Sequence, residues 1–255
     1  MDIVLTSAAD GVGTITMNRA DKRNALSAEL VAGLHAAFLQ MGSNESVKVI
    51  VLSGEGSAFC AGVDLAYLQQ ITENSPLENL ADSTALKDML QSIVDCPKPV
   101  IAKVHGAAIA GGCGLATVCD IVIAGREKSL FGYSEVRIGF IPAIVLVYLV
   151  RKIGDTQSRR LVLTAENINA EEALRLGLIT KVVNDEDLEA ETMLMARQIA
   201  KNSSSAMAMS KMMLGAVQGM SLDAGLHYAT VMNALARQTD DCKQGIATFL
   251  KSPKG

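Results

Sequence analysis

Short apolar segments rich in β-branched residues recur along the first half of the chain, and each predicts a strand. The first two, Ile3–Leu5 and Val12–Met17, flank an Asp-Gly pair, which favours a hairpin turn. Three more cover Val47–Leu52, Val100–Val104 and Asp120–Ala124, and runs of this kind are typical of strands that are covered on both faces. The chain therefore predicts a buried sheet that begins with a hairpin.

Helical patterns fill the stretches between these strands. Ser27 can cap a helix whose apolar side chains share one face: Leu30, Leu34, Phe38 and Met41. Leu86–Val94 predicts another helix, and Pro142 can occupy the first position of an apolar helix over Ala143–Val150. Residues 70–84 are polar and include Pro76, so they predict a mobile excursion of the kind that often covers a ligand site. Strands that alternate with helices predict an α/β fold with crossover connections.

From about residue 187 the strand patterns stop and the helical patterns continue. We therefore divide the chain into a core that carries the candidate site, residues 1–186, and a C-terminal helical region, residues 187–255. Eight of the twelve methionines lie after residue 190, and methionine gives a surface that can adapt to what it packs against. This surface is either the ordinary core of a helical region or an interface between subunits.

Composition narrows the classes of function. The net charge of −4, the absence of tryptophan and the 4% of aromatic residues argue against binding to nucleic acid. Five cysteines with no close CxxC pair predict free thiols in a reducing compartment. We expect a cytoplasmic protein, because no signal-peptide pattern opens the chain and the apolar run over 139–150 is too short to span a membrane. No cluster of His, Asp and Glu has metal-ligand spacing, so we expect no metal.

Two glycine-containing segments, Ala58–Asp64 and Ala108–Leu115, carry the candidate chemistry because each follows a predicted strand and precedes a predicted helix. Glycine lets a backbone N–H turn toward a ligand, and two such loops that converge would offer a pair of donors to a developing oxyanion. Gly111, Gly112 and Gly114 lack the GxGxxG spacing, and no Gly-Lys-Ser/Thr occurs. Both familiar modes of nucleotide binding are therefore disfavoured.

The order and spacing of several motifs resemble the crotonase superfamily of enoyl-CoA hydratases and isomerases. The motifs are Asn18–Leu26, Ala58–Asp64, Gly111–Gly114, Cys119–Asp120, and Glu135 with Ile138–Pro142. The resemblance covers essentially the whole chain. It implies a spiral of ββα units with a C-terminal helical trimerisation region, trimers that often pair into hexamers, and acyl-CoA thioester substrates. It implies no permanently bound cofactor, since coenzyme A enters as part of the substrate.

The resemblance also implies a role for particular residues. The backbone N–H groups of Val63 and Gly111 would form the oxyanion hole, and Glu135 would be the acid/base. Residues that would hold the CoA moiety and the substrate are Arg19, Lys22, Arg23, Ala25, Leu26, Ala61, Gly62, Asp64, Tyr67 and Gly112. The basic loop that carries Arg19, Lys22 and Arg23 would face the CoA phosphates, although its residues alone are equally consistent with a solvated turn. Phe249 and Lys251 resemble residues that a neighbouring helix adds to the pocket.

The chain departs from typical hydratases at Gly114, where those enzymes carry the first of two acids. The second acid remains as Glu135, within a stretch that looks like bacterial members near the methylglutaconyl-CoA hydratases. We expect a hydratase in which Glu135 takes a proton from water and returns it to the same face of the alkene. The alternatives are a Δ3,Δ2-enoyl-CoA isomerase with Glu135 as proton shuttle, and a non-catalytic CoA- or RNA-binding relative. The acyl preference would depend on pocket walls such as residues 66–85 and 140–150.

Overall fold

The predicted buried strands form one six-stranded sheet in the computed structural model, which describes residues 2–251. In spatial order the strands are β1 (Val4–Ala9), β2 (Val12–Met17), β3 (Val49–Gly54), β5 (Val100–Val104), β7 (Ile121–Gly125) and β10 (Lys181–Val183). The first pair is antiparallel and the others are parallel. Asp10 and Gly11 both have positive φ, 52° and 79°, as a type I′ turn requires, so the predicted hairpin is confirmed.

A second sheet of four short strands was not predicted from the apolar pattern. Its strands, in spatial order, are β4 (Ala58–Cys60), β6 (Ala107–Ile109), β8 (Leu130–Gly132) and β9 (Asn167–Asn169). The first three are parallel to one another, and β9 pairs with β8 in the antiparallel sense. Three residues are too few to show the alternation that identifies a strand.

The chain winds between the two sheets as a spiral of ββα units. The helices of the core are α1 (Ala28–Ser43), α2 (Leu65–Ile71), α3 (Pro76–Val94), α4 (Gly111–Thr117), α5 (Ala143–Thr164), α6 (Ala170–Arg175) and α7 (Leu188–Ile199). Each of three successive units gives one strand to each sheet and then a helix: β3 and β4 lead to α2 and α3, β5 and β6 to α4, and β7 and β8 through the 3-10 turn η2 (Glu135–Ile138) to α5. The expected α/β spiral is confirmed.

Residues 70–84 form two helices rather than the mobile excursion that their polarity predicts. α2 continues to Ile71, and α3 begins at Pro76. Ser75 and Glu78 form a reciprocal capping box at the start of α3, which satisfies two N–H groups that the helix end would otherwise leave unpaired. The expected excursion was wrong in that most of this segment is helical. The start of α3 depends on its capping box rather than on a buried apolar stripe, because Leu77 and Leu80 are both exposed.

Alternate side chains of the central strands pack to opposite faces of the large sheet. Ile50 and Leu52 belong to the larger apolar cluster, which also contains residues of α1 and α3 such as Phe38 and Leu90. Their neighbours Val49 and Val51 lie in a second cluster, with Leu188 and Ala196 of α7. α7 therefore packs on the sheet, although the division at residue 187 groups it with the C-terminal region.

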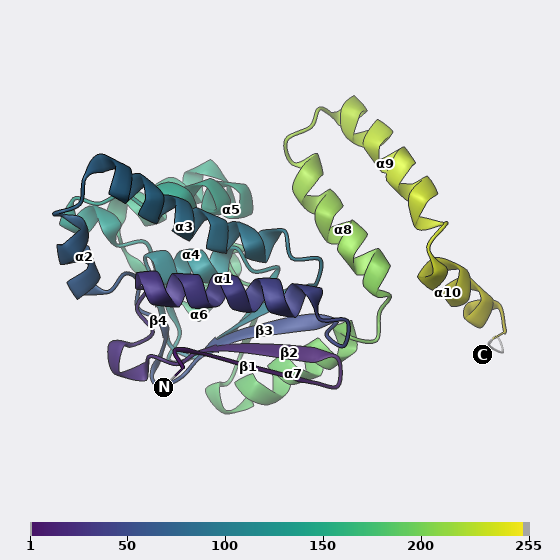
Figure 1. The fold of residues 1–255 in the computed structure, drawn as a ribbon, viewed down its shortest axis with the longest axis horizontal. Coiled ribbons are helices and arrows are strands. Elements are labelled where there is room, and N and C mark those ends of the chain that lie inside the picture. The colour runs from purple at the N-terminus through teal and green to yellow at the C-terminus, as the bar shows by residue number, and fades with distance from the viewer. Residues whose placement is uncertain (1, 252–255) are drawn as a thin grey trace.

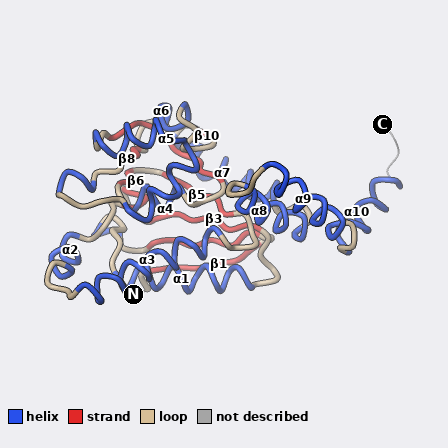
Figure 2. Tube along the Cα trace, turned by 90° about the horizontal axis from the view of Figure 1, so that it is seen from above, coloured by secondary structure: helices blue, strands red, loops and turns tan. Residues whose placement is uncertain are grey.

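The last three helices, α8 (Ser204–Val217), α9 (Leu222–Ala236) and α10 (Asp240–Lys251), extend to one side of the core (Figures 1 and 2). One side chain ties α8 to the core, because the Lys211 Nζ donates to the backbone oxygens of Ile93 and Lys98 and to Asp120. Large apolar side chains of α9 and α10 are exposed, including Leu222 at 82% and Phe249 at 81%. Over residues 2–251, none of the helices combines the length and the apolar character that crossing a bilayer requires.

Candidate active site

The two glycine loops approach each other so closely that their backbones are in contact. A Cβ on Gly62, which has φ +97°, would lie 3.0 Å from the Ile109 oxygen and 3.1 Å from the Cβ of Ala110. A Cβ on Gly112 would lie 2.1 Å from the Cys60 oxygen, a separation that no side chain tolerates. Glycine is therefore required at both positions to bring the loop after β4 against the start of α4.

A short ladder fixes the loop that carries Val63. The N–H of Leu26 donates to the oxygen of Gly62 (2.7 Å), and the oxygen of Leu26 accepts from the N–H of Asp64 (2.9 Å). These bonds use the groups on either side of Val63. The N–H of Val63 takes no part in the ladder and has no acceptor among the described residues, so it is free to donate to a ligand.

Strained backbone precedes the second candidate donor. Ala110 has φ 50° and ψ −125°, a conformation that residues with a Cβ rarely adopt. The next residue, Gly111, is the first of α4, and the N–H of a first helical residue has no acceptor within its own helix. The strain orients the peptide between these two residues, and the N–H of Gly111 is available at the cavity described below.

Glu135 is the first residue of η2, just after β8, where Tyr133 anchors the turn through a hydrogen bond with the Thr117 hydroxyl (2.7 Å). The backbone oxygen of Glu135 accepts from the N–H of Phe140 (3.1 Å). Its side chain is 8% exposed, and its Oε2 is buried with no hydrogen-bond partner. Burial raises the pKa of this carboxyl above its ordinary value, because the ionised form loses solvation. An unpaired buried carboxyl of this kind is unusual outside functional sites.

Val63, Gly111 and Glu135 line the same cavity, which has a volume of about 340 Å³. Its other walls are predominantly apolar and come from α1, α2, α3 and the start of α5: Leu26, Val31, Leu68, Ile71, Leu86, Phe140, Ile141, Pro142, Ile144 and Val145. Both segments expected to form pocket walls, residues 66–85 and 140–150, contribute to it. The structure thus places two free N–H groups and one buried carboxyl around an apolar space.

The residues assigned to CoA binding fall into three sets. Leu26 and Tyr67 line the cavity, whereas Ala25, Ala61, Gly62 and Gly112 shape the loops beside it. Arg19 donates to Asp64 (3.0 Å) and to the Ala25 oxygen (2.5 Å), so its charge is paired and helps to hold the Val63 loop. Lys22 and Arg23 are exposed and form no ion pair with the described part of the chain.

Phe249 and Lys251 are not brought to this cavity. Both lie on α10, which extends away from the core (Figure 1), and neither lines the cavity. Within one chain they have no contact with Val63, Gly111 or Glu135. The assignment of Phe249 and Lys251 to this kind of pocket remains a prediction. It would require that they reach the cavity of a second copy of the chain.

Val145 occupies the space beside Gly114. A Cβ on Gly114 would lie 2.0 Å from the Cγ1 of Val145 and 2.7 Å from its Cβ. Val145 is 4% exposed and lines the cavity from the first turn of α5. Val145 therefore fills the space that a side chain at position 114 would need, a contact that no local pattern in the sequence reveals.

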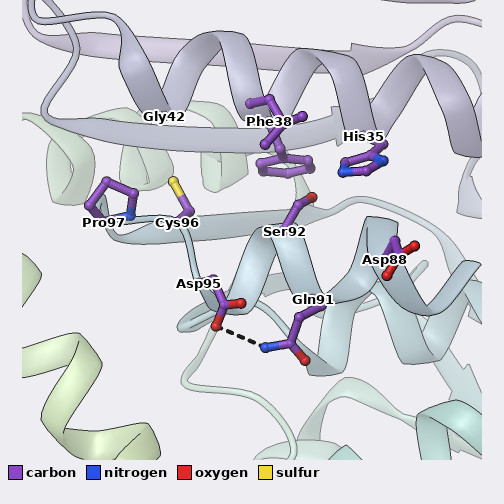
Figure 3. Close-up of a pocket in the computed structure, with 10 residues that line it drawn as sticks. His35, Phe38, Gly42, Asp88, Gln91, Ser92, Asp95, Cys96 and Pro97 are labelled. Carbon is purple, nitrogen blue, oxygen red and sulfur yellow. Dashed lines mark hydrogen bonds between the residues drawn. The ribbon is translucent and has the colours of Figure 1, made fainter. Parts of the chain in front are cut away.

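A second cavity, of about 360 Å³, lies between α1 and α3, away from the glycine loops. Figure 3 shows its polar side chains, in which the Gln91 Nε2 donates to Asp95 (2.8 Å) and Cys96 lies beside Pro97. None of the predicted site residues lines it. Among the residues that the structure describes, no group of three or more His, Cys, Asp or Glu is arranged to hold a metal ion.

Comparison with known proteins agrees with this architecture. Residues 7–254 match the enoyl-CoA hydratase/isomerase family. A Thermus thermophilus protein named "Putative enoyl-CoA hydratase" is 38% identical over 240 residues, which cover 94% of each chain. The crystal structure of an enoyl-CoA hydratase from Mycobacterium smegmatis superposes with a TM-score of 0.93 at 31% identity, and covers 98% of this chain and 97% of that one. For a Legionella pneumophila enoyl-CoA hydratase/isomerase (crotonase) structure the TM-score is 0.90 at 37% identity, with 97% and 96% covered.

The fold and the paired glycine loops define a protein of the crotonase type. The chain belongs to the enoyl-CoA hydratase/isomerase family.

Proposed function

We propose that the chain is an enoyl-CoA hydratase that uses Glu135 as its single acid/base. The observation that carries the proposal is the buried carboxyl of Glu135, whose Oε2 has no hydrogen-bond partner, in the cavity that Val63 and Gly111 also line. Family membership supports CoA thioesters as the substrate class, and the relatives named above as hydratases support addition of water.

The proposed reaction begins with the thioester oxygen, which accepts hydrogen bonds from the N–H groups of Val63 and Gly111. These bonds strengthen as negative charge develops on that oxygen, and they polarise the conjugated double bond. Glu135 then takes a proton from water while the water oxygen adds to C3. The same carboxyl returns the proton to C2 of the enolate. Its raised pKa suits this role, because a carboxyl that holds a proton more tightly is a better base.

A Δ3,Δ2-enoyl-CoA isomerase is the second candidate, and Val145 is the observation that favours it. Because Val145 fills the space beside Gly114, no second acid projects from α4 at that position. A single carboxyl is sufficient to take a proton from C2 of a 3-enoyl thioester and return it to C4. The oxyanion hole would stabilise the same enolate in both reactions.

We also propose how the rest of the chain takes part. The exposed Lys22 and Arg23 would face the phosphates of CoA, while Arg19 holds the Val63 loop through Asp64. The exposed apolar side chains of α9 and α10 would be covered in a homotrimer or hexamer. In that assembly Phe249 and Lys251 would reach the pocket of a neighbouring subunit.

The two candidate reactions separate when the purified protein is given trans-2- and trans-3-enoyl-CoA in heavy water. We expect the 2-enoyl thioester to give 3-hydroxyacyl-CoA with deuterium at C2, measured by mass spectrometry. A shift of the double bond in the 3-enoyl thioester, without added water, would instead assign the isomerase. No turnover of either thioester would contradict both.

The raised pKa of Glu135 has a consequence for the pH profile. Glu135 must be ionised to accept a proton, so kcat/KM is expected to fall as the pH drops through the pKa of this carboxyl in the free enzyme. Because burial raises that pKa, the acid limb should lie above the value of about 4.3 for an exposed glutamate. A profile that stays flat down to that value would contradict Glu135 as the base.

A further inference from the structure

The cavity contains a second carboxylate that the proposed reaction does not use. Asp82 of α3 lines the cavity together with Tyr67 of α2, and the hydroxyl of Tyr67 donates a hydrogen bond to the Oδ1 of Asp82. Asp82 is half-buried. The pair joins two helices that form the wall of the pocket, and it holds the carboxylate at a fixed place on that wall.

No positive charge compensates Asp82 within the described residues. The lysine nearest along α3, Lys87, pairs with Asp88, and no Lys or Arg of residues 2–251 forms an ion pair with Asp82. The surrounding wall is apolar and includes Leu68, Ile71 and Leu86. Burial, together with the hydrogen bond to Asp82 and its negative charge, raises the pKa of Tyr67 to about 12, so this hydroxyl remains a neutral donor.

A negative charge on the acyl group of a substrate would share this space with Asp82. The whole cavity has a volume of about 340 Å³, so a terminal carboxylate on a short acyl chain has little room to move away from Asp82. Like charges in a largely apolar space repel strongly, because the medium between them screens weakly. Juxtaposed like charges are an effective means of rejecting the wrong partner.

We infer that Asp82, held by Tyr67, makes this pocket select uncharged enoyl groups and reject enoyl groups that end in a carboxylate. This inference rests on the proposed function, because it assumes that the acyl group of a CoA thioester occupies the cavity. It assigns monocarboxylic enoyl-CoA as the substrate class. It excludes the monothioesters of dicarboxylic acids, and with them methylglutaconyl-CoA, although the stretch around Glu135 looks like that of the methylglutaconyl-CoA hydratases.

The test compares two thioesters that differ only at the end of a six-carbon chain, hex-2-enoyl-CoA and hex-2-enedioyl-CoA. For the unmodified protein we expect kcat/KM to favour the uncharged chain by about tenfold or more. Asp82→Asn keeps the size and the hydrogen bond with Tyr67 but removes the charge, so the preference should fall several-fold. Asp95→Asn is the matched control, because Asp95 caps the C-terminal end of the same helix, lines the cavity between α1 and α3 (Figure 3) and holds no lysine or arginine in an ion pair with the described residues. It should keep the full preference.

A binding measurement separates this inference from the proposed reaction. Hexanoyl-CoA and adipoyl-CoA are saturated, so calorimetry gives their Kd values without any chemistry at C2 or C3. If the protein turns over neither enoyl thioester but Asp82→Asn lowers the preference for hexanoyl-CoA, the selection by charge stands and the hydratase proposal fails. If Asp82→Asn leaves both the kinetic and the binding preference unchanged, the inference is overturned. Tyr67→Phe retains the charge of Asp82, so the rejection of adipoyl-CoA should persist in it.

Discussion

Glu135→Gln is expected to lower the turnover of a 2-enoyl-CoA by about 10²- to 10⁴-fold and to leave the fold and the affinity for free CoA unchanged. The amide has nearly the size of the carboxyl, but it cannot take a proton from water at neutral pH. The proposed oxyanion donors are backbone groups of Val63 and Gly111, so the substitution leaves them in place. Steady-state kinetics with a short 2-enoyl-CoA and calorimetry with CoA measure the two parts of this prediction.

Glu127→Gln is the matched control, since Glu127 is exposed and lies outside the cavity. It should retain the activity of the unmodified protein. If Glu135→Gln retained it as well, Glu135 would not be the acid/base, and the account of the site would be wrong. Loss of CoA affinity in Glu135→Gln would indicate a structural role for the carboxyl instead.

The pH dependence of stability gives an independent check on the same side chain. The pKa of Glu135 is raised in the folded protein by burial, so its ionisation destabilises the folded state as the pH rises from the unfolded pKa through the folded one. Glutamine at this position does not ionise. We expect Glu135→Gln to equal the unmodified protein in stability at low pH and to exceed it above neutrality.

Gly114→Glu, which would restore the acid of typical hydratases, is expected to destabilise the fold by about 3 kcal/mol or more, because it overpacks the core and buries a carboxylate. The new Cβ would lie 2.0 Å from the Cγ1 of Val145, and both residues are buried between α4 and α5. Combining Gly114→Glu with Val145→Gly removes the methyl groups of Val145 that would clash with the new side chain. The double variant should be more stable than the sum of the two single effects predicts.

The coupling between positions 114 and 145 is measured by a double-mutant cycle. Denaturant unfolding is compared for the unmodified protein, Gly114→Glu, Val145→Gly and the double variant. We expect an interaction energy of about 1–3 kcal/mol that favours the double variant. Additive effects would mean that Val145 does not fill the place of the missing acid. If the double variant folds, its ratio of hydration to isomerisation should exceed that of the unmodified protein, because it offers a second acid beside the substrate.

Apolar runs and helix caps in the sequence predicted the central strands of the large sheet and the helices between them. The buried runs form β3, β5 and β7, and Ser27 caps α1 as expected. The short strands β4, β6 and β8 escaped prediction because they are defined by their partners rather than by periodicity. The helical start of α3 escaped prediction because its buried side chains, Met89, Leu90 and Ile93, all lie in the second half of the helix.

From the residues alone only the backbone part of the site was predictable, whereas Glu135, Leu26 and Tyr67, which also line the cavity, were expected from the family resemblance. Glycines at 62, 111 and 112 are visible in the sequence, and a tight approach between loops requires such residues. The partner of Gly114 is Val145, a long-range contact between two helices, and Asp82 of α3 meets Tyr67 of α2 through a hydrogen bond between side chains 15 residues apart in the sequence. Such contacts depend on tertiary packing and leave no local signal.

Exchange of the C2 protons of butanoyl-CoA in heavy water tests whether Val63, Gly111 and Glu135 act together on a thioester. This saturated thioester can neither add water nor shift a double bond. Exchange requires only that Val63 and Gly111 stabilise the enolate and that Glu135 moves a proton at C2. We expect the unmodified protein to introduce deuterium at C2, measured by mass spectrometry, well above the buffer rate, and Glu135→Gln to do so only at the buffer rate. Equal exchange by the two proteins, or none by either, would contradict this expectation.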